Sequence, residues 1–124
     1  MELNMIDFQA FHALSSIQIG AFEDKPTSLT GNQQEAATEL WSSADGLTEI
    51  GVWECTPGTF TADRSKSAEF CHILSGSATL TNADGSGERT VKAGDLLVLP
   101  LGWKGVWTIN AHLRKTYVIQ KAAG

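Results

Sequence analysis

Apolar and polar residues alternate in short stretches along much of this chain, and Gly, Pro, Asn and Asp separate the stretches about every ten positions. Alternation with a period of two predicts β-strands that bury one face. From residue 47 onward, strands are predicted over residues 48–56, 59–61, 69–74, 77–81, 89–91, 96–99, 106–109 and 113–120. No helical stretch of crossover length lies between them, so the pattern predicts an antiparallel all-β sandwich or barrel and argues against a parallel α/β fold.

The first 45 residues are less regular than the rest. Residues 15–19 alternate and predict a short strand, whereas the Pro and Gly residues within 22–32 predict a loop. Residues 35–42 have a helix-forming composition, yet their alternation and the Asp45-Gly46 turn that follows favour a strand entering a hairpin. We therefore expect a loosely structured N-terminal segment that packs on the barrel or on a neighbouring subunit.

Two glycines mark places where the sheet is expected to turn. Gly76 follows an apolar strand, and a positive φ or a close backbone approach there would let the sheet bend around a barrel corner. Gly94 opens a tight turn into residues 96–99, whose continuous apolar run predicts a buried strand.

Composition narrows the class of protein. The 124 residues fit one domain, and a hydrophobic fraction of 42% is ordinary for an ordered core. A net charge of -5 without clustered Lys or Arg argues against nucleic acid and against an anionic membrane surface as partners. No apolar run approaches the roughly 20 residues that cross a bilayer. Residues 1–11 carry no Lys or Arg, unlike a secretory signal, so we expect a cytoplasmic protein.

The two cysteines, Cys55 and Cys71, lack the CxxC spacing of redox and metal sites. In a cytosolic chain, isolated cysteines are most simply interpreted as buried thiols. A disulfide, or a reactive thiol at Cys71, is the alternative interpretation.

Two spacings carry a more specific signal, namely Glu69-x6-Gly76 and Gly94-x5-Pro100-x-Gly102. They resemble the ends of the two motifs of the cupin superfamily (RmlC-like proteins). The chain is similar to a small single-domain branch that includes an ethanolamine-utilisation accessory protein and, more distantly, ureidoglycine aminohydrolase. This resemblance covers roughly residues 38–120. It implies an antiparallel double-stranded β-helix, the cupin jelly-roll barrel, in a single domain over residues 1–124, and it implies a homodimer.

The resemblance also implies a metal site, but most of the ligands are missing. In metal-binding cupins, two His and a Glu from the first motif and one His from the second hold the ion. This chain keeps only Glu69; it has Asp63, Arg64, Ser65 and Lys66 near the first two positions and Gly105 at the last. One carboxylate is a poor site for a transition metal, so we expect no metal and no other cofactor.

Other groups could in principle replace the missing histidines. His72 lies three residues from Glu69, and this odd spacing on a strand points the two side chains to opposite faces. Cys71 shares the face of Glu69, so a site built from Glu69, Cys71 and Asp63 is the alternative to a metal-free barrel.

Strand alternation also predicts which side chains line the barrel interior. An apolar and aromatic surface with a few polar groups is typical of a small-molecule pocket. The competing interpretation is a barrel core filled by its own side chains. The predicted lining consists of Trp53, Phe60, Glu69, Cys71, Trp107, Lys115 and Tyr117, with Lys104 as a further candidate for ligand binding.

Glu69 is the central candidate for chemistry. One hypothesis is that burial raises the pKa of Glu69, which would then act as a general acid or base with Tyr117 as its proton partner. Lys115 or Lys104 would hold a substrate carboxylate. The simpler alternatives are that Glu69 pairs with Lys115 or Tyr117, or lies in water at the mouth of the barrel.

These residues are compatible with three functions. The first is a metal-independent cupin that binds or transforms a small polar metabolite. The second is a non-catalytic accessory protein, which would act as a ligand sensor or as a structural homodimer. The third is a metal-dependent cupin enzyme. The sequence leaves open whether the protein is an enzyme.

Overall fold

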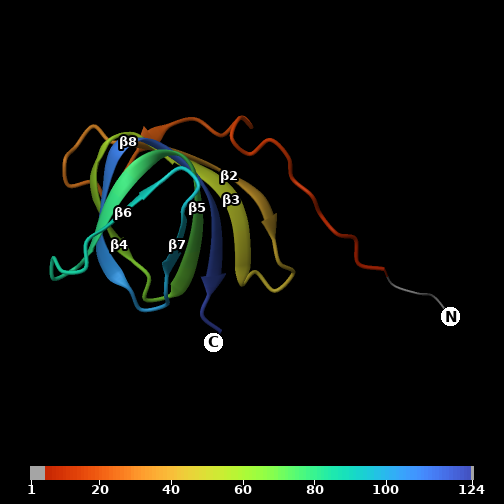
Figure 1. Cartoon of the computed structure of the whole chain (residues 1–124). Helices are drawn as coiled ribbons and strands as arrows, with labels where there is room; N and C mark the ends of the chain where they lie inside the picture. Colours follow the sequence, from red (N-terminus) through yellow and green to blue (C-terminus); the bar gives the residue numbers. More distant parts are fainter. Residues whose placement is uncertain (1–4, 124) are drawn as a thin grey trace.

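The computed structural model describes residues 5–123, in which eight strands form one sheet that curls into a barrel (Figure 1). All strand pairs are antiparallel, which confirms the all-β prediction. The residues described contain no helix, and hence none with the length and apolar character to cross a membrane. The strands are β1 (Glu23–Asp24), β2 (Gln34–Ser42), β3 (Thr48–Cys55), β4 (Gly58–Asp63), β5 (Ser67–Asn82), β6 (Arg89–Lys92), β7 (Leu96–Leu99) and β8 (Lys104–Lys121).

The two longest strands, β5 and β8, pair along almost their whole length and organise the rest. The edge of β8 that faces away from β5 pairs with β4 along residues 104–109 and with β3 along residues 113–120. The free edge of β5 pairs with β7 near its start and with β6 near its end. Each half of this long pair therefore carries its own set of short strands, which is the arrangement of a jelly-roll barrel.

The bend between these halves lies at Gly76, as predicted. The register between β5 and β8 shifts three times between Ile73 and Ala78, and Gly76 has a φ of 83°. A Cβ atom at Gly76 would lie 2.1 Å from the backbone oxygen of His112, on the facing strand. Only glycine permits both this conformation and this close approach.

The predicted hairpin between residues 35–42 and 48–56 is confirmed as β2 and β3. At its tip the Ser43 amide donates to the Thr48 oxygen over 2.9 Å, and the Leu47 amide donates to Asp45 Oδ1 over 2.9 Å. Gly46 supplies the positive φ of 73° that this turn needs.

Only part of the N-terminal segment contacts the outer face of the barrel: residues 5–13 are exposed and extend away from it, and no strand forms over residues 15–19 (Figure 1). Residues 14–16 form a turn instead. Arg114 on β8 donates through Nη1 to the backbone oxygens of Leu14 and Ile17, at 2.8 and 2.9 Å. These carbonyls therefore bond to a side chain and not to a neighbouring strand.

Strand β7 is present, but the prediction that it is buried was wrong. Leu96 and Val98 are 70% and 48% exposed, and only Leu99 is buried. β7 pairs with β5 along one edge, and no other described strand packs on its outer face. The side chains on that face, Leu96 and Val98, are therefore in contact with solvent. The inward side chains join a core cluster made of Cys55, Phe60, Cys71, Ile73, Ala78, Leu80, Val91, Leu99, Trp107, Ile109 and Leu113.

We predict that Gly76→Ala destabilises the protein more than Gly94→Ala does. Both positions have a positive φ, but a Cβ at Gly94 would meet nothing within 4 Å. Gly94→Ala should therefore lose only the strain of a left-handed alanine, about 1–2 kcal/mol. Gly76→Ala should lose a further ~1–3 kcal/mol because the backbone of His112 must move. Equilibrium urea unfolding measures both, and equal losses would contradict the close-approach explanation.

Candidate functional site

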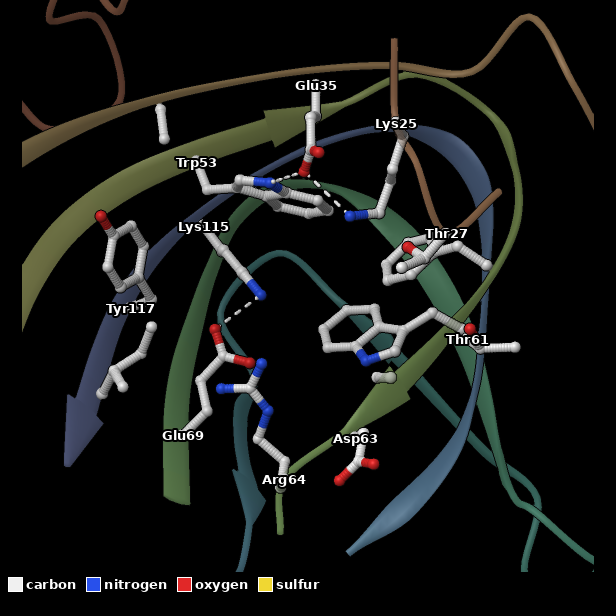
Figure 2. A pocket seen from close by; sticks show the side chains of 15 residues that line it. Lys25, Thr27, Glu35, Trp53, Thr61, Asp63, Arg64, Glu69, Lys115 and Tyr117 are labelled. Atoms are coloured by element: carbon white, nitrogen blue, oxygen red, sulfur yellow. Dashed lines mark hydrogen bonds and ion pairs between the residues drawn. The ribbon is translucent and has the colours of Figure 1, made fainter. Parts of the chain in front are cut away.

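The barrel interior is only partly filled by the core cluster. Beside it lies a pocket of about 450 Å³ (Figure 2). Aromatic rings and charged groups dominate its walls, a composition that fits a small polar ligand. The lining residues are Lys25, Thr27, Glu35, Ala37, Trp53, Phe60, Thr61, Ala62, Asp63, Arg64, Glu69, Trp107, Lys115, Tyr117 and Ile119.

A buried ion pair lies in the wall of this pocket. Lys115 Nζ on β8 donates to Glu69 Oε2 on β5 over 3.0 Å, and the two side chains are 6% and 9% exposed. The Lys115 ammonium also lies 4.4 Å from the ring centroids of both Trp53 and Trp107. Lys115 is therefore held by a carboxylate and by two aromatic faces, each of which favours its charged form.

The pair keeps both groups charged. Burial by itself would raise the pKa of the Glu69 carboxyl, but the Lys115 ammonium outweighs it and holds that pKa below its usual value. Burial by itself would lower the pKa of Lys115, but Cys71 and the Glu69 carboxylate raise it above its usual value. The hypothesis of a raised Glu69 pKa was therefore wrong, and its alternative, a pair with Lys115, is the arrangement observed.

A second ion pair, which the strand pattern did not predict, also lies next to Trp53. Lys25 Nζ bonds to Glu35 Oε1 at 2.8 Å, and Trp53 Nε1 donates to the same oxygen over 2.9 Å. Lys25 Nζ also lies 4.2 Å from the centroid of the Phe60 ring. Lys25 comes from a segment predicted as loop; the β1–β2 pairing and the bond from the Lys25 amide to the Gln33 oxygen, 2.9 Å long, hold it beside the pocket.

Six of the eight side chains proposed from the sequence line the pocket, and two do not. Cys71 is fully buried behind Glu69, and burial raises its pKa to about 12, so it is not a reactive thiol. Lys104 is exposed because it precedes the inward-facing Gly105 and so points outward. The six are Trp53, Phe60, Glu69, Trp107, Lys115 and Tyr117; their catalytic or binding roles stay predictions.

Tyr117 is in the pocket but does not contact Glu69 as a proton partner. Its hydroxyl donates to Glu49 Oε1 over 3.4 Å. Burial, followed by the nearby Glu49 carboxylate, raises its pKa to about 12. A phenol with this pKa keeps its proton at neutral pH and can act as a hydrogen-bond donor to a ligand.

The residues at the positions of the family's metal ligands, Glu69 and Gly105, do not fit the metal ion that the cupin motifs imply. Glu69 is already neutralised by Lys115. At Gly105, the position of a family histidine, a Cβ would lie 2.3 Å from the Thr81 backbone oxygen and 2.2 Å from the Trp103 ring, which leaves no room for an imidazole. Within residues 5–123, no three His, Cys, Asp or Glu side chains come together as a candidate metal site.

Lys115→Met should destabilise the protein by about 3–5 kcal/mol, because it leaves the Glu69 carboxylate buried without a partner. The double variant Lys115→Met/Glu69→Leu should recover most of this loss, since both charges are then absent. Lys104→Met makes the same change at an exposed position and serves as the control. Urea unfolding at neutral pH measures all four proteins, and a double variant no better than Lys115→Met would contradict the pairing.

Acid pH should test the same pair. The pKa of Glu69 in the folded protein lies below its usual value of 4.5, so its contribution to stability is complete above pH 4.5 and is lost as the pH falls through the folded-state pKa. The double variant has no such group. The unfolding free energy of the unmodified protein should therefore fall more steeply below pH 4.5 than that of the double variant, and parallel curves would exclude this contribution.

Comparisons with known proteins agree with this architecture. The family model of the EutQ-like cupin domain matches residues 42–117. A search of curated proteins finds no match.

Solved structures share the fold at low sequence identity. A DUF861-family protein of unknown function from Pseudomonas syringae is 24% identical with a TM-score of 0.70; the match covers 83% of this chain but 43% of that one. A putative ethanolamine utilization protein Q from Salmonella typhimurium is 20% identical with a TM-score of 0.63, covering 84% and 100%. Ectoine synthase from P. lautus is 16% identical with a TM-score of 0.64, covering 81% and 68%.

These identities show the fold alone. The family match is stronger, because it spans more than half of the chain and includes both glycine motifs and the strands that carry Glu69 and Lys115. The protein therefore belongs to the EutQ-like cupin domain family.

Proposed function

We propose that this cupin binds a small polar metabolite in the barrel pocket and does so without a metal ion. The observation that carries the proposal is that the buried Lys115–Glu69 pair lines a pocket of about 450 Å³. A barrel filled by its own side chains would leave no such space. A buried ion pair contributes little net stability, so its position beside a hollow favours a role in ligand binding.

The protonation states support binding better than proton transfer. A general acid or base works best when its pKa lies near the operating pH. The pKa of Glu69 is lowered and the pKa of Lys115 is raised, so both move away from neutral pH and each group stays charged. The pocket therefore offers a fixed carboxylate, a fixed ammonium and the Tyr117 hydroxyl to a ligand, with aromatic rings around its apolar part.

One structural neighbour, ectoine synthase, is by its name an enzyme that makes a small molecule. This likeness is compatible with a ligand in the barrel, but at 16% identity it carries no substrate to this chain. The proposal is therefore based on the pocket.

A panel of small carboxylates, amides, amines and alcohols tests the proposal by ligand-observed NMR. We expect several members to bind the unmodified protein. Ala37 lines the pocket, so Ala37→Phe should fill part of the space and weaken binding at least tenfold. Ala93→Phe makes the same change in the exposed turn between β6 and β7 and should leave binding unchanged. Binding that survives Ala37→Phe, or a panel with no binder, would reject the proposal.

A further inference from the structure

Arg64 lies between β4 and β5 and enters the pocket from a firmly held backbone. Its amide donates to the Trp103 oxygen over 2.7 Å, and its own oxygen accepts from the Gly102 amide over 2.7 Å. These two bonds fix the point from which the side chain extends. Figure 2 shows its guanidinium inside the pocket, beside Glu69.

The guanidinium of Arg64 has more hydrogen-bond donors than partners. It carries five N–H donors, and the one hydrogen bond it makes within the described part of the chain is from Nη1 to Ser67 Oγ, at 3.3 Å. Arg64 Nε is buried and has no hydrogen-bond partner among the described residues. Among residues 5–123, no carboxylate lies within the 4.0 Å that defines an ion pair with Arg64. Nε is closed off from the pocket, whereas Nη2 is not among the buried atoms and makes no hydrogen bond within residues 5–123, so it can donate to an acceptor that enters from outside the chain.

The local charge also favours an anion. Around Glu69, the two cations Lys115 and Arg64 lie near a single carboxylate. This group of three side chains therefore has one excess positive charge. Lys25 and Glu35 neutralise each other farther along the wall. The remaining acid of the lining, Asp63, is exposed at the rim and accepts from the Ser65 amide over 2.8 Å, so water screens it.

We propose that Arg64 binds a carboxylate of the ligand, which makes small carboxylates the ligand class of this pocket. This inference rests on the proposed function and adds the residue that selects the ligand. A guanidinium can hold a carboxylate through two parallel N–H···O bonds, and the two Nη groups at the end of the Arg64 side chain provide such a fork. Lys115 keeps Glu69 and the two tryptophans as partners, so the ligand need not break the buried pair. The apolar part of the ligand would lie against Phe60 and Trp107, which stack at 5.7 Å.

Two matched pairs of probes test this assignment: benzoate with benzamide, and butyrate with butyramide. Each pair keeps the shape and removes the negative charge. Titrations at low salt, followed by ligand-observed NMR, should show each carboxylate binding at least tenfold more tightly than its amide. Arg64→Gln should abolish that preference, whereas Arg64→Lys should keep part of it because the charge remains and the fork is lost. Arg89→Gln removes the same charge from the exposed strand β6 and should change nothing.

The outcomes separate the two proposals. If carboxylate and amide bind equally in the unmodified protein, or if Arg64→Gln leaves the preference intact, the role of Arg64 is overturned. The proposed function then still stands, provided that Ala37→Phe weakens the binding of both probes. If neither carboxylate binds although another compound of the panel does, only the role of Arg64 is overturned; if no compound of the panel binds, the proposed function is overturned as well. Far-UV circular dichroism and thermal unfolding of each variant confirm that it is folded.

Discussion

The interior of this barrel depends on one interaction, the 3.0 Å ion pair between the Lys115 ammonium and the Glu69 carboxylate. Neither charge could be buried alone without a large penalty, so each accounts for the other's position. The pairing of β5 with β8 places both strands side by side, and their alternation points both side chains inward. The rings of Trp53 and Trp107 then pack against the ammonium, and both rings also line the pocket.

The same pair gives this cupin an interior different from the metal site that the family motifs imply. A lysine supplies the positive charge beside the motif glutamate, where the family motifs imply a metal ion. Gly105 reinforces the difference, because the backbone of Thr81 and the ring of Trp103 occupy the space that a histidine would need. The protein thus combines the family's barrel and glycine framework with a site made of fixed organic charges. Such a site can recognise a ligand by charge and shape.

Strand positions and inward faces could be predicted from the sequence because both follow from local alternation and from turn residues. This is why the sequence alone places Glu69, Lys115 and Trp107 in one interior. Burial and charge state could not be predicted in the same way. The apolar run of residues 96–99 does not reveal that Leu96 faces solvent, and the pKa direction at Glu69 depends on a partner 46 positions away along the chain.

Two charged pocket residues that strand alternation does not predict, Lys25 and Arg64, come from irregular segments. Lys25 reaches the pocket through a two-residue strand, and Arg64 reaches it from the connection between β4 and β5. Neither segment has a periodicity that assigns its side chains to a face. In the sequence, Arg64 stands out only because it lies near the family's histidine positions, and its unpaired donors become visible only in three dimensions.

The most direct test of a metal-free interior is elemental analysis of the full chain, purified without a chelator or a histidine tag from cells grown with ample Mn, Fe, Ni and Zn. If Lys115 supplies the charge beside Glu69, the metal content should be far below one ion per chain, and addition of these ions should not raise the thermal midpoint. A near-stoichiometric metal ion that disappears in Glu69→Gln would contradict this, because it would place a second cation where the lysine is proposed to act alone.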